Sequence, residues 1–199
     1  MKKFKLFVLC VTMLAGNLFF LSPGYAADVY KIDTVHSSLG FSVTHLMVSK
    51  TTGVFSDYEG TITYDPNDLT TSNAQVTIQT ASIDTRSKQR DDHLRSADFF
   101  DAATHPQITF ISKKFVPSAD QYLITGDLTI KGVTKDIVVP VKITGPVVSP
   151  FGATVIGLAG QVTINRQDYG VSWNKNLDNG GAVVGDNVDV FINIEAQKQ

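Results

Sequence analysis

Acidic, basic and imidazole side chains lie side by side in one short stretch of the chain, RDDHLRSADFF, at residues 90–100. General acid–base catalysis uses such a mixture, because one group must accept a proton where its neighbour donates one. On a helix, however, Asp91 and Arg95 are four residues apart with the acid first, which favours a surface ion pair. We interpret the stretch as structural. Catalysis by Asp91, Asp92 and His93 is the alternative.

The same stretch has the features of a short capped helix between Ser87 and Ala97. Asp84, Thr85 and Ser87 each offer a side-chain oxygen that can cap the first turn. The charged residues can remain in solvent while the apolar ones pack on a neighbour. We predict that the helix docks through Leu94, Phe99 and Phe100.

The remaining chemically active side chains form no known catalytic or metal-binding pattern. The four histidines are His36, His45, His93 and His105. HExxH and GxSxG motifs are absent, and no cysteine accompanies the histidines. Ser37 directly follows His36, but adjacent residues of a strand point to opposite faces, which disfavours proton transfer between them. We predict no catalytic residue, no metal site and no cofactor.

Strands must position these residues, because the dominant pattern from Asp28 onward has period two. The clearest hairpin joins residues 122–130 to residues 135–144 through Lys131 and Gly132. The same alternation predicts strands at 38–46, 53–64, 74–83, 107–116, 154–165 and 187–196. Long strands with one apolar face favour a closed barrel. We predict an all-β fold, a single antiparallel β-barrel of about eight strands with one short helix.

The N-terminus is typical of a cleavable secretory signal peptide. Lysines precede an apolar run over residues 6–21, and Gly24 and Ala26 supply the small residues that a signal peptidase requires. We predict a signal peptide over residues 1–26 and one domain over residues 27–199. A transmembrane anchor is the weaker alternative, because the run falls short of about 18 to 20 uninterrupted apolar residues.

Cleavage would remove three lysines and no acid, which shifts the formal net charge from -2 to -5. An acidic chain without a basic run is a poor partner for nucleic acid or for an anionic membrane surface. We therefore expect neither nucleic-acid binding nor stable membrane insertion. Cys10 is the one cysteine and would leave with the signal peptide. A disulfide-free exported chain is more typical of a bacterial periplasm than of a small extracellular scaffold.

Five motifs, in this order, resemble the YceI-like family of exported bacterial proteins. They are YKIDTVHSSLGFSVTHL (30–46), GVFSDYEGTI (53–62), SIDTRSKQRDDHLRSADFFDAATHPQITF (82–110), GDLTIKGVTKDIVVPV (126–141) and INRQDYGVSW (164–173). The resemblance implies a lipocalin-like antiparallel barrel whose interior holds a polyisoprenoid or similar long-chain lipid. It also implies a protein without enzymatic activity.

The inward-facing strand positions predict which residues contact such a ligand. They are Phe41, Val43, His45, Phe110, Ile124, Leu128, Val139, Val141, Ile156, Leu158, Val190 and Ile192. The expected partner is a polyisoprenoid, a prenyl quinone or a fatty-acid-like lipid that is transported, stored or sequestered in the periplasm. Two alternatives remain open: a periplasmic enzyme acting on a lipid head group at the barrel mouth, and a ligand-free, stress-related interaction module whose own side chains fill the core. A homodimer also remains open.

Overall fold

The structure is a computed structural model and describes residues 27–178 and 180–199, so the predicted signal peptide lies outside the described residues. Its strands are β1 (Asp28–His45), β2 (Ser49–Phe55), β3 (Tyr58–Tyr64), β4 (Asn73–Gln79), β5 (Ile83–Asp84), β6 (Gln107–Ser118), β7 (Gln121–Ile130), β8 (Val133–Val148), β9 (Thr154–Asn165) and β10 (Val184–Lys198). The helices are α1 (Lys88–Arg95) and the 3-10 turns η1 (Leu69–Thr71), η2 (Thr80–Ser82) and η3 (Arg166–Tyr169).

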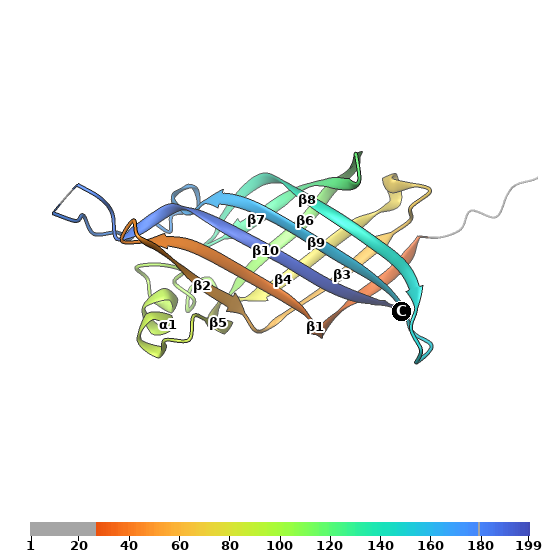
Figure 1. Ribbon diagram of the computed structural model, residues 1–199, viewed down its shortest axis with the longest axis horizontal. Coiled ribbons are helices and arrows are strands. Elements are labelled where there is room, and N and C mark those ends of the chain that lie inside the picture. The colour runs from red at the N-terminus through yellow and green to blue at the C-terminus, as the bar shows by residue number, and fades with distance from the viewer. Residues whose placement is uncertain (1–26, 179) are drawn as a thin grey trace, which may run out of the picture.

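The strands close into an antiparallel barrel, because β1 pairs with β10 as well as with β2 and β3 (Figure 1). β2 and β3 are two segments of one interrupted neighbour of β1. β5 pairs with β2 as β4 pairs with β3, so these two also continue one another. Within residues 27–178 and 180–199, ten strand segments thus occupy eight positions around the barrel, which confirms the predicted fold class.

Local sequence explains the most regular part of the wall. Lys131 and Gly132 have φ angles of 48° and 76°, and this pair of left-handed residues forms a two-residue turn whose twist suits a hairpin. The predicted β7–β8 hairpin is therefore confirmed. β4, in contrast, ends at Gln79 and not at residue 83 as predicted. Thr80 N–H still donates to the Pro106 carbonyl at 2.8 Å, in register with the Gln79–Gln107 pair, but proline has no N–H to donate in return, so the ladder ends there.

The helix α1 lies at one end of the barrel, beside the β1–β2 turn, and the C-terminus lies at the other end (Figure 1). Two apolar clusters divide the interior accordingly. One surrounds Tyr30, Tyr64 and Ile156 toward the C-terminal end, and the other surrounds Phe99 and Tyr169 near α1. Within the described ranges, no helix has the length and apolar character needed to cross a bilayer.

Candidate functional site

Three cavities follow one another through the barrel and share lining residues. We call them the inner cavity, of about 140 Å³, the middle cavity, of about 160 Å³, and the mouth cavity, of about 470 Å³. The inner and middle cavities share Leu39, Ile78, Leu128 and Val190. The middle and mouth cavities share Phe41, Val43, Leu94, Phe99 and Val184. The three spaces therefore lie next to one another, and we call this row of cavities the path.

The inner cavity has a wholly apolar lining. Its wall consists of Ile32, Leu39, Ile62, Ala74, Val76, Ile78, Phe110, Ile124, Leu128, Ile137, Val139, Val141, Leu158, Val162, Val190, Ile192 and Ile194. Tyr64 and Tyr122 are absent from this lining; their hydroxyl groups hydrogen-bond to each other at 3.1 Å. Burial and this hydrogen bond raise the pKa of Tyr64, so its phenol stays protonated and neutral. Such a space favours hydrocarbon over any polar or charged group.

The mouth cavity mixes apolar and polar side chains. Thr44, His45 and Thr51 come from β1 and β2, whereas Arg90 and His93 come from α1. Its volume falls within the range of about 300 to 1,000 Å³ that is usual for small-molecule sites. A ligand with an apolar chain and a polar end would therefore meet matching surroundings along this path.

Eleven of the twelve predicted ligand residues line one or more of these cavities. Phe41 and Val43 line the middle and mouth cavities, His45 lines the mouth cavity, and the other eight face the inner cavity. Ile156 is the exception, because it is 1% exposed and packs in the core without lining any of the three cavities. Contact with a ligand stays a prediction for all twelve.

The sequence pattern did not predict several of the cavity-lining residues, because their positions depend on tertiary contacts. Tyr169, Val171 and Trp173 follow β9 in an irregular segment that has no period to follow. Leu94, Phe99 and Phe100 were predicted to dock the helix, and they also line the middle cavity. The period-two pattern did carry a signal for Leu39 and Ile78, which share faces with Phe41 and Val76.

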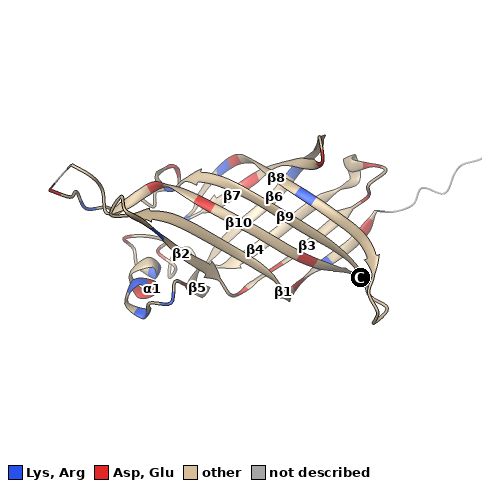
Figure 2. Ribbon diagram, viewed as in Figure 1, with Lys and Arg blue, Asp and Glu red and all other residues tan. Residues whose placement is uncertain are grey.

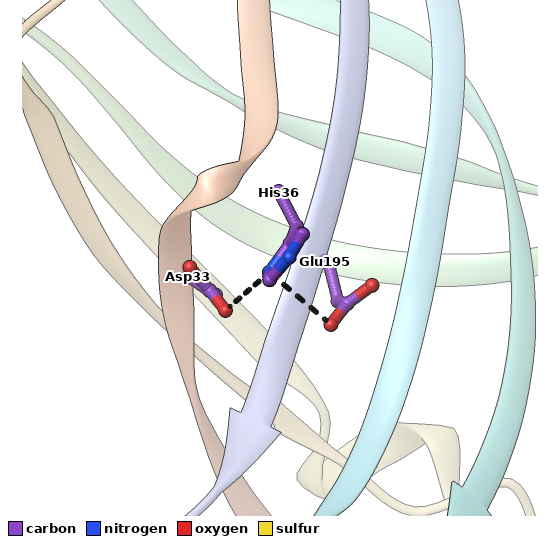
Figure 3. A group of neighbouring side chains, drawn as sticks. All are labelled: Asp33, His36 and Glu195. Carbon is purple, nitrogen blue, oxygen red and sulfur yellow. Dashed lines mark hydrogen bonds and ion pairs between the residues drawn. The ribbon is translucent and has the colours of Figure 1, made fainter. Parts of the chain in front are cut away.

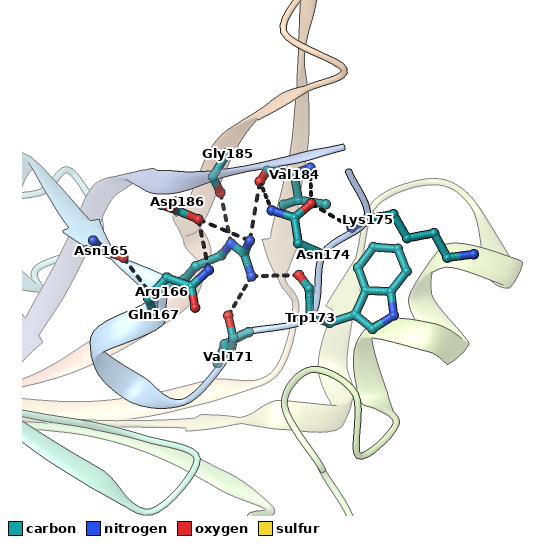
Figure 4. Close-up of polar contacts among 10 residues, drawn as sticks. All are labelled: Asn165, Arg166, Gln167, Val171, Trp173, Asn174, Lys175, Val184, Gly185 and Asp186. Carbon is teal, nitrogen blue, oxygen red and sulfur yellow. Dashed lines mark hydrogen bonds and ion pairs between the residues drawn. The ribbon is translucent and has the colours of Figure 1, made fainter. Parts of the chain in front are cut away.

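Arg166 holds the irregular wall of the middle and mouth cavities together (Figure 4). Its side chain is 6% exposed. Nε donates to the Gly185 carbonyl at 2.9 Å, and Nη1 donates to the carbonyls of Val171 at 2.6 Å and Trp173 at 2.9 Å. Nη2 donates to the Val184 carbonyl and lies 3.3 Å from an Asp186 carboxylate oxygen. Burial lowers the pKa of Arg166, and Asp186 opposes that shift.

The charged face of α1 is organised differently from the prediction. Figure 2 shows both signs of charge gathered on this helix. Asp91 does not pair with Arg95. It is buried and accepts hydrogen bonds from the backbone N–H of Thr85 at 2.9 Å and from the Thr85 hydroxyl. The loop before the helix turns back onto α1, and this turn explains why a residue expected on the surface is enclosed.

Arg95 and Arg90 also bind backbone carbonyl groups near the start of the helix. Arg95 donates to the carbonyls of Ala81 and Ile83, both at 2.7 Å, while Arg90 donates to the Thr85 carbonyl at 2.7 Å. Ser87 occupies the N-cap position without a side-chain capping bond. The helix is thus anchored through arginines and one buried aspartate.

The two other members of the alternative catalytic set have structural partners as well. Asp92 pairs with Lys88 at 2.6 Å and lies 3.3 Å from Arg95, and the bond from Lys88 lowers its pKa. His93 Nε2 lies 2.9 Å from an Asp98 carboxylate oxygen. Its ring meets Phe99 and Trp173 edge-on, with centroid distances of 5.0 and 4.9 Å. These contacts give the charged side chains a structural role, because they hold α1 in place over the barrel mouth.

A second group of titratable residues lies on the outside of the barrel, where β1 and β10 lose register (Figure 3). Asp33 faces Glu195 and Ser38 faces Asn193, so four residues of β1 stand opposite one of β10. Asp33 accepts a hydrogen bond from Val35 N–H at 2.9 Å and lies 2.8 Å from His36 Nδ1.

His36, Asp33 and Glu195 place their ligand atoms within 4.8 Å of one another, a donor set that a divalent cation could use. His36 is exposed, however, and its hydrogen bond with Asp33 already accounts for the arrangement. That bond raises the pKa of His36 and lowers the pKa of Asp33. The absence of a metal site, predicted from the sequence, stays a prediction.

Comparison with known proteins adds independent information. Residues 30–196 match the family described as YceI-like domain. A UPF0312 protein of Staphylococcus aureus strain MSSA476 is 39% identical over 160 residues, which covers 80% of this chain and 91% of that protein. A UPF0312 protein of Staphylococcus epidermidis strain RP62A matches with the same identity and coverage.

Solved structures with the same architecture include BcnA of Burkholderia cenocepacia, with a TM-score of 0.73 and 28% identity over 82% of this chain and 98% of that one. The YceI protein of Campylobacter jejuni gives a TM-score of 0.66 with 33% identity, covering 78% of this chain and 90% of that one. A polyisoprenoid binding domain from Saccharophagus degradans, implicated in plant cell wall breakdown, gives a TM-score of 0.67 with coverage of 88% and 100%. It is 17% identical, and this likeness concerns the fold alone.

Proposed function

We propose, since the chain belongs to the YceI-like domain family, that it binds a polyisoprenoid, a prenyl quinone or a similar long apolar chain inside its barrel. The observation that carries this proposal is the row of three neighbouring cavities. Its inner parts are lined almost wholly by hydrocarbon, and its mouth carries polar groups. The solved polyisoprenoid binding domain with this fold is consistent with the proposal.

Physical chemistry favours a chain over a compact ligand. The inner and middle cavities are each small and lie next to each other with shared lining residues, so a slender molecule fits them better than a broad one. Each buried methylene group contributes about 0.8 kcal/mol to binding, and a chain of about 20 carbons offsets the usual association cost of about 4 to 15 kcal/mol. A charged anchor is not required.

Binding without chemical turnover is the role that the contacts of α1 support. Asp91 is committed to Thr85 and Asp92 to Lys88, so neither is a free carboxylate at the mouth. The signal-like N-terminus further supports export to the periplasm, where the protein would transport, store or sequester its ligand.

A cysteine placed in the path tests the proposal directly, because residues 27–199 contain no cysteine. Val190 lines the junction of the inner and middle cavities, while its neighbour Phe191 is 41% exposed on the outer face. Val190→Cys should react slowly with a bulky apolar maleimide, and a bound prenyl chain should protect it further. Once labelled, it should lose most uptake of a fluorescent prenyl chain.

Phe191→Cys is the matched control, and its labelling should leave uptake unchanged. Protein purified from its own periplasm should also release a stoichiometric apolar molecule into organic solvent, measured by mass spectrometry. If no chain co-purifies, none is taken up, and the Val190→Cys variant labels equally with and without added prenyl chain, the proposed function is wrong.

A further inference from the structure

The turn between β1 and β2 carries an exposed apolar tip beside the cavity mouth. We define the mouth tip as Leu46, Met47 and Val48, whose exposed fractions are 39%, 64% and 83%. It directly follows His45, which lines the mouth cavity. Leu46 N–H donates to the carbonyl of Val183, another mouth residue, at 2.9 Å. The tip is therefore fixed at the rim of the path.

The backbone of this turn has a conformation that is energetically unfavourable for the residues that occupy it. Leu46 and Met47 have φ angles of 51° and 64°, in the left-handed region where glycine and asparagine are favoured. None of the three tip residues belongs to either apolar cluster of the described core. The two described core clusters therefore do not account for the exposed apolar side chains at this turn, which suggests a contact outside the chain.

The charges near the mouth tip indicate which kind of surface it can contact. Residues 44–49 carry no acidic side chain. The nearest lysine or arginine along the sequence, Lys50, is already paired with Asp189 at 2.6 Å. A turn of this kind can enter an uncharged apolar medium without burying an unpaired charge.

We infer that the mouth tip docks on a lipid bilayer, so that an apolar chain passes between the membrane and the barrel without crossing water. This inference rests on the proposed function, which requires exchange of a water-insoluble chain. The mouth tip and the mouth cavity belong to the same end of the barrel, so a docked tip brings the entrance close to the bilayer surface. Because the contact is apolar, high salt should not weaken it.

The first test measures flotation of the protein purified from its own periplasm with phosphatidylcholine vesicles that contain no ligand. Met47→Asn with Val48→Ser should lower the partition coefficient by about a hundredfold, because each of the two apolar side chains removed from hydrocarbon contributes roughly tenfold. Asparagine suits the left-handed backbone at position 47, so the thermal midpoint should not fall. Loss of flotation therefore cannot be assigned to unfolding.

Phe151→Ser is the matched control. Phe151 is 95% exposed on the β8–β9 turn, at the end of the barrel opposite the mouth tip. Its replacement should leave flotation unchanged. Equal flotation of the wild-type protein and the double variant, an equal loss in Phe151→Ser, or no flotation of the wild-type protein would each overturn the inference.

A second measurement separates this inference from the proposed function. A fluorescent prenyl chain added from ethanol should bind the double variant in solution as it binds the wild-type protein. Transfer of the same chain from vesicles should be slower in the variant by about tenfold. Flotation through the tip without any chain binding would refute the function and leave the docking surface standing. Normal chain binding, with transfer from vesicles that is equally fast in the wild-type protein and the double variant, would refute the docking surface and leave the proposed function standing.

Discussion

One buried guanidinium ties an irregular segment to the start of β10 at the entrance. Arg166 donates to the backbone carbonyl groups of Val171 and Trp173 in that segment and to two carbonyl groups at the start of β10. We expect Arg166→Ala to lower the free energy of unfolding by about 3 kcal/mol or more, since the four carbonyl groups lose this donor and, among the described residues, only that of Val184 keeps another side-chain donor, Asn174 Nδ2. Arg166→Lys should recover only part of this, because an ammonium group lacks the planar set of five donors. Urea denaturation followed by tryptophan fluorescence would measure both. A loss below about 1 kcal/mol for Arg166→Ala would contradict this account.

The exposed pair of Asp33 and His36 should make stability depend on pH in a defined direction. The raised pKa of His36 means that its contribution is complete below the unfolded value of about 6.5 and is lost as pH rises through the folded value. The lowered pKa of Asp33 means that its contribution is present above about 3.9 and is lost as pH falls through the folded value.

The difference in thermal midpoint between the wild-type protein and His36→Gln should therefore be largest near about pH 5 and smaller near about pH 8. Thermal unfolding across this pH range gives the measurement. In an Asp33→Asn background the same difference should no longer vary with pH in this way. A constant difference between the wild-type protein and His36→Gln would show that the hydrogen bond does not couple to folding.

At the scale of the element, two adjacent carboxylates of α1 should behave very differently. Asp91→Asn weakens two hydrogen bonds to Thr85 in a buried site and should cost about 1 to 3 kcal/mol of stability. Asp92→Asn removes only exposed ion pairs and should cost less than about 1 kcal/mol. Hydrogen exchange should show faster opening of α1 in the first variant alone. Equal effects would mean that Asp91 does not anchor the helix.

The position of this helix was predictable from sequence, but the partners of its charges were not. Spacing alone placed Asp91 opposite Arg95, whereas the loop from Thr85 to Ser87 brings another donor closer. Period-two alternation likewise located β7, β8 and β10, since each strand exposes one face to the interior. The alternation could not predict that Tyr169 and Trp173 line the cavities. Their positions depend on hydrogen bonds from Arg166 to an irregular segment that has no sequence period.

At the scale of the molecule, the barrel is neither hollow throughout nor filled throughout. Val190 lies where two cavities join, whereas Ile156 lies in close-packed core. We expect Ile156→Trp to destabilise the ligand-free protein by about 1 to 3 kcal/mol, because neighbouring side chains must leave their rotamers. Val190→Trp should cost less stability yet remove most chain binding. Thermal unfolding and titration with a fluorescent prenyl chain separate the two effects. If both variants destabilise equally, the path is closed to a chain.

The tyrosines beyond the inner cavity set the length of chain that the barrel can enclose. The hydroxyl groups of Tyr64 and Tyr122 hydrogen-bond to each other near the end of the barrel remote from α1, and Tyr30 is buried beside them. A chain entering at the mouth would advance until its tail meets these rings, and any further length would remain outside. Affinity should therefore rise with each prenyl unit and then level off. The length at the plateau would report the depth of the barrel, and Tyr64→Ala should shift that plateau toward longer chains.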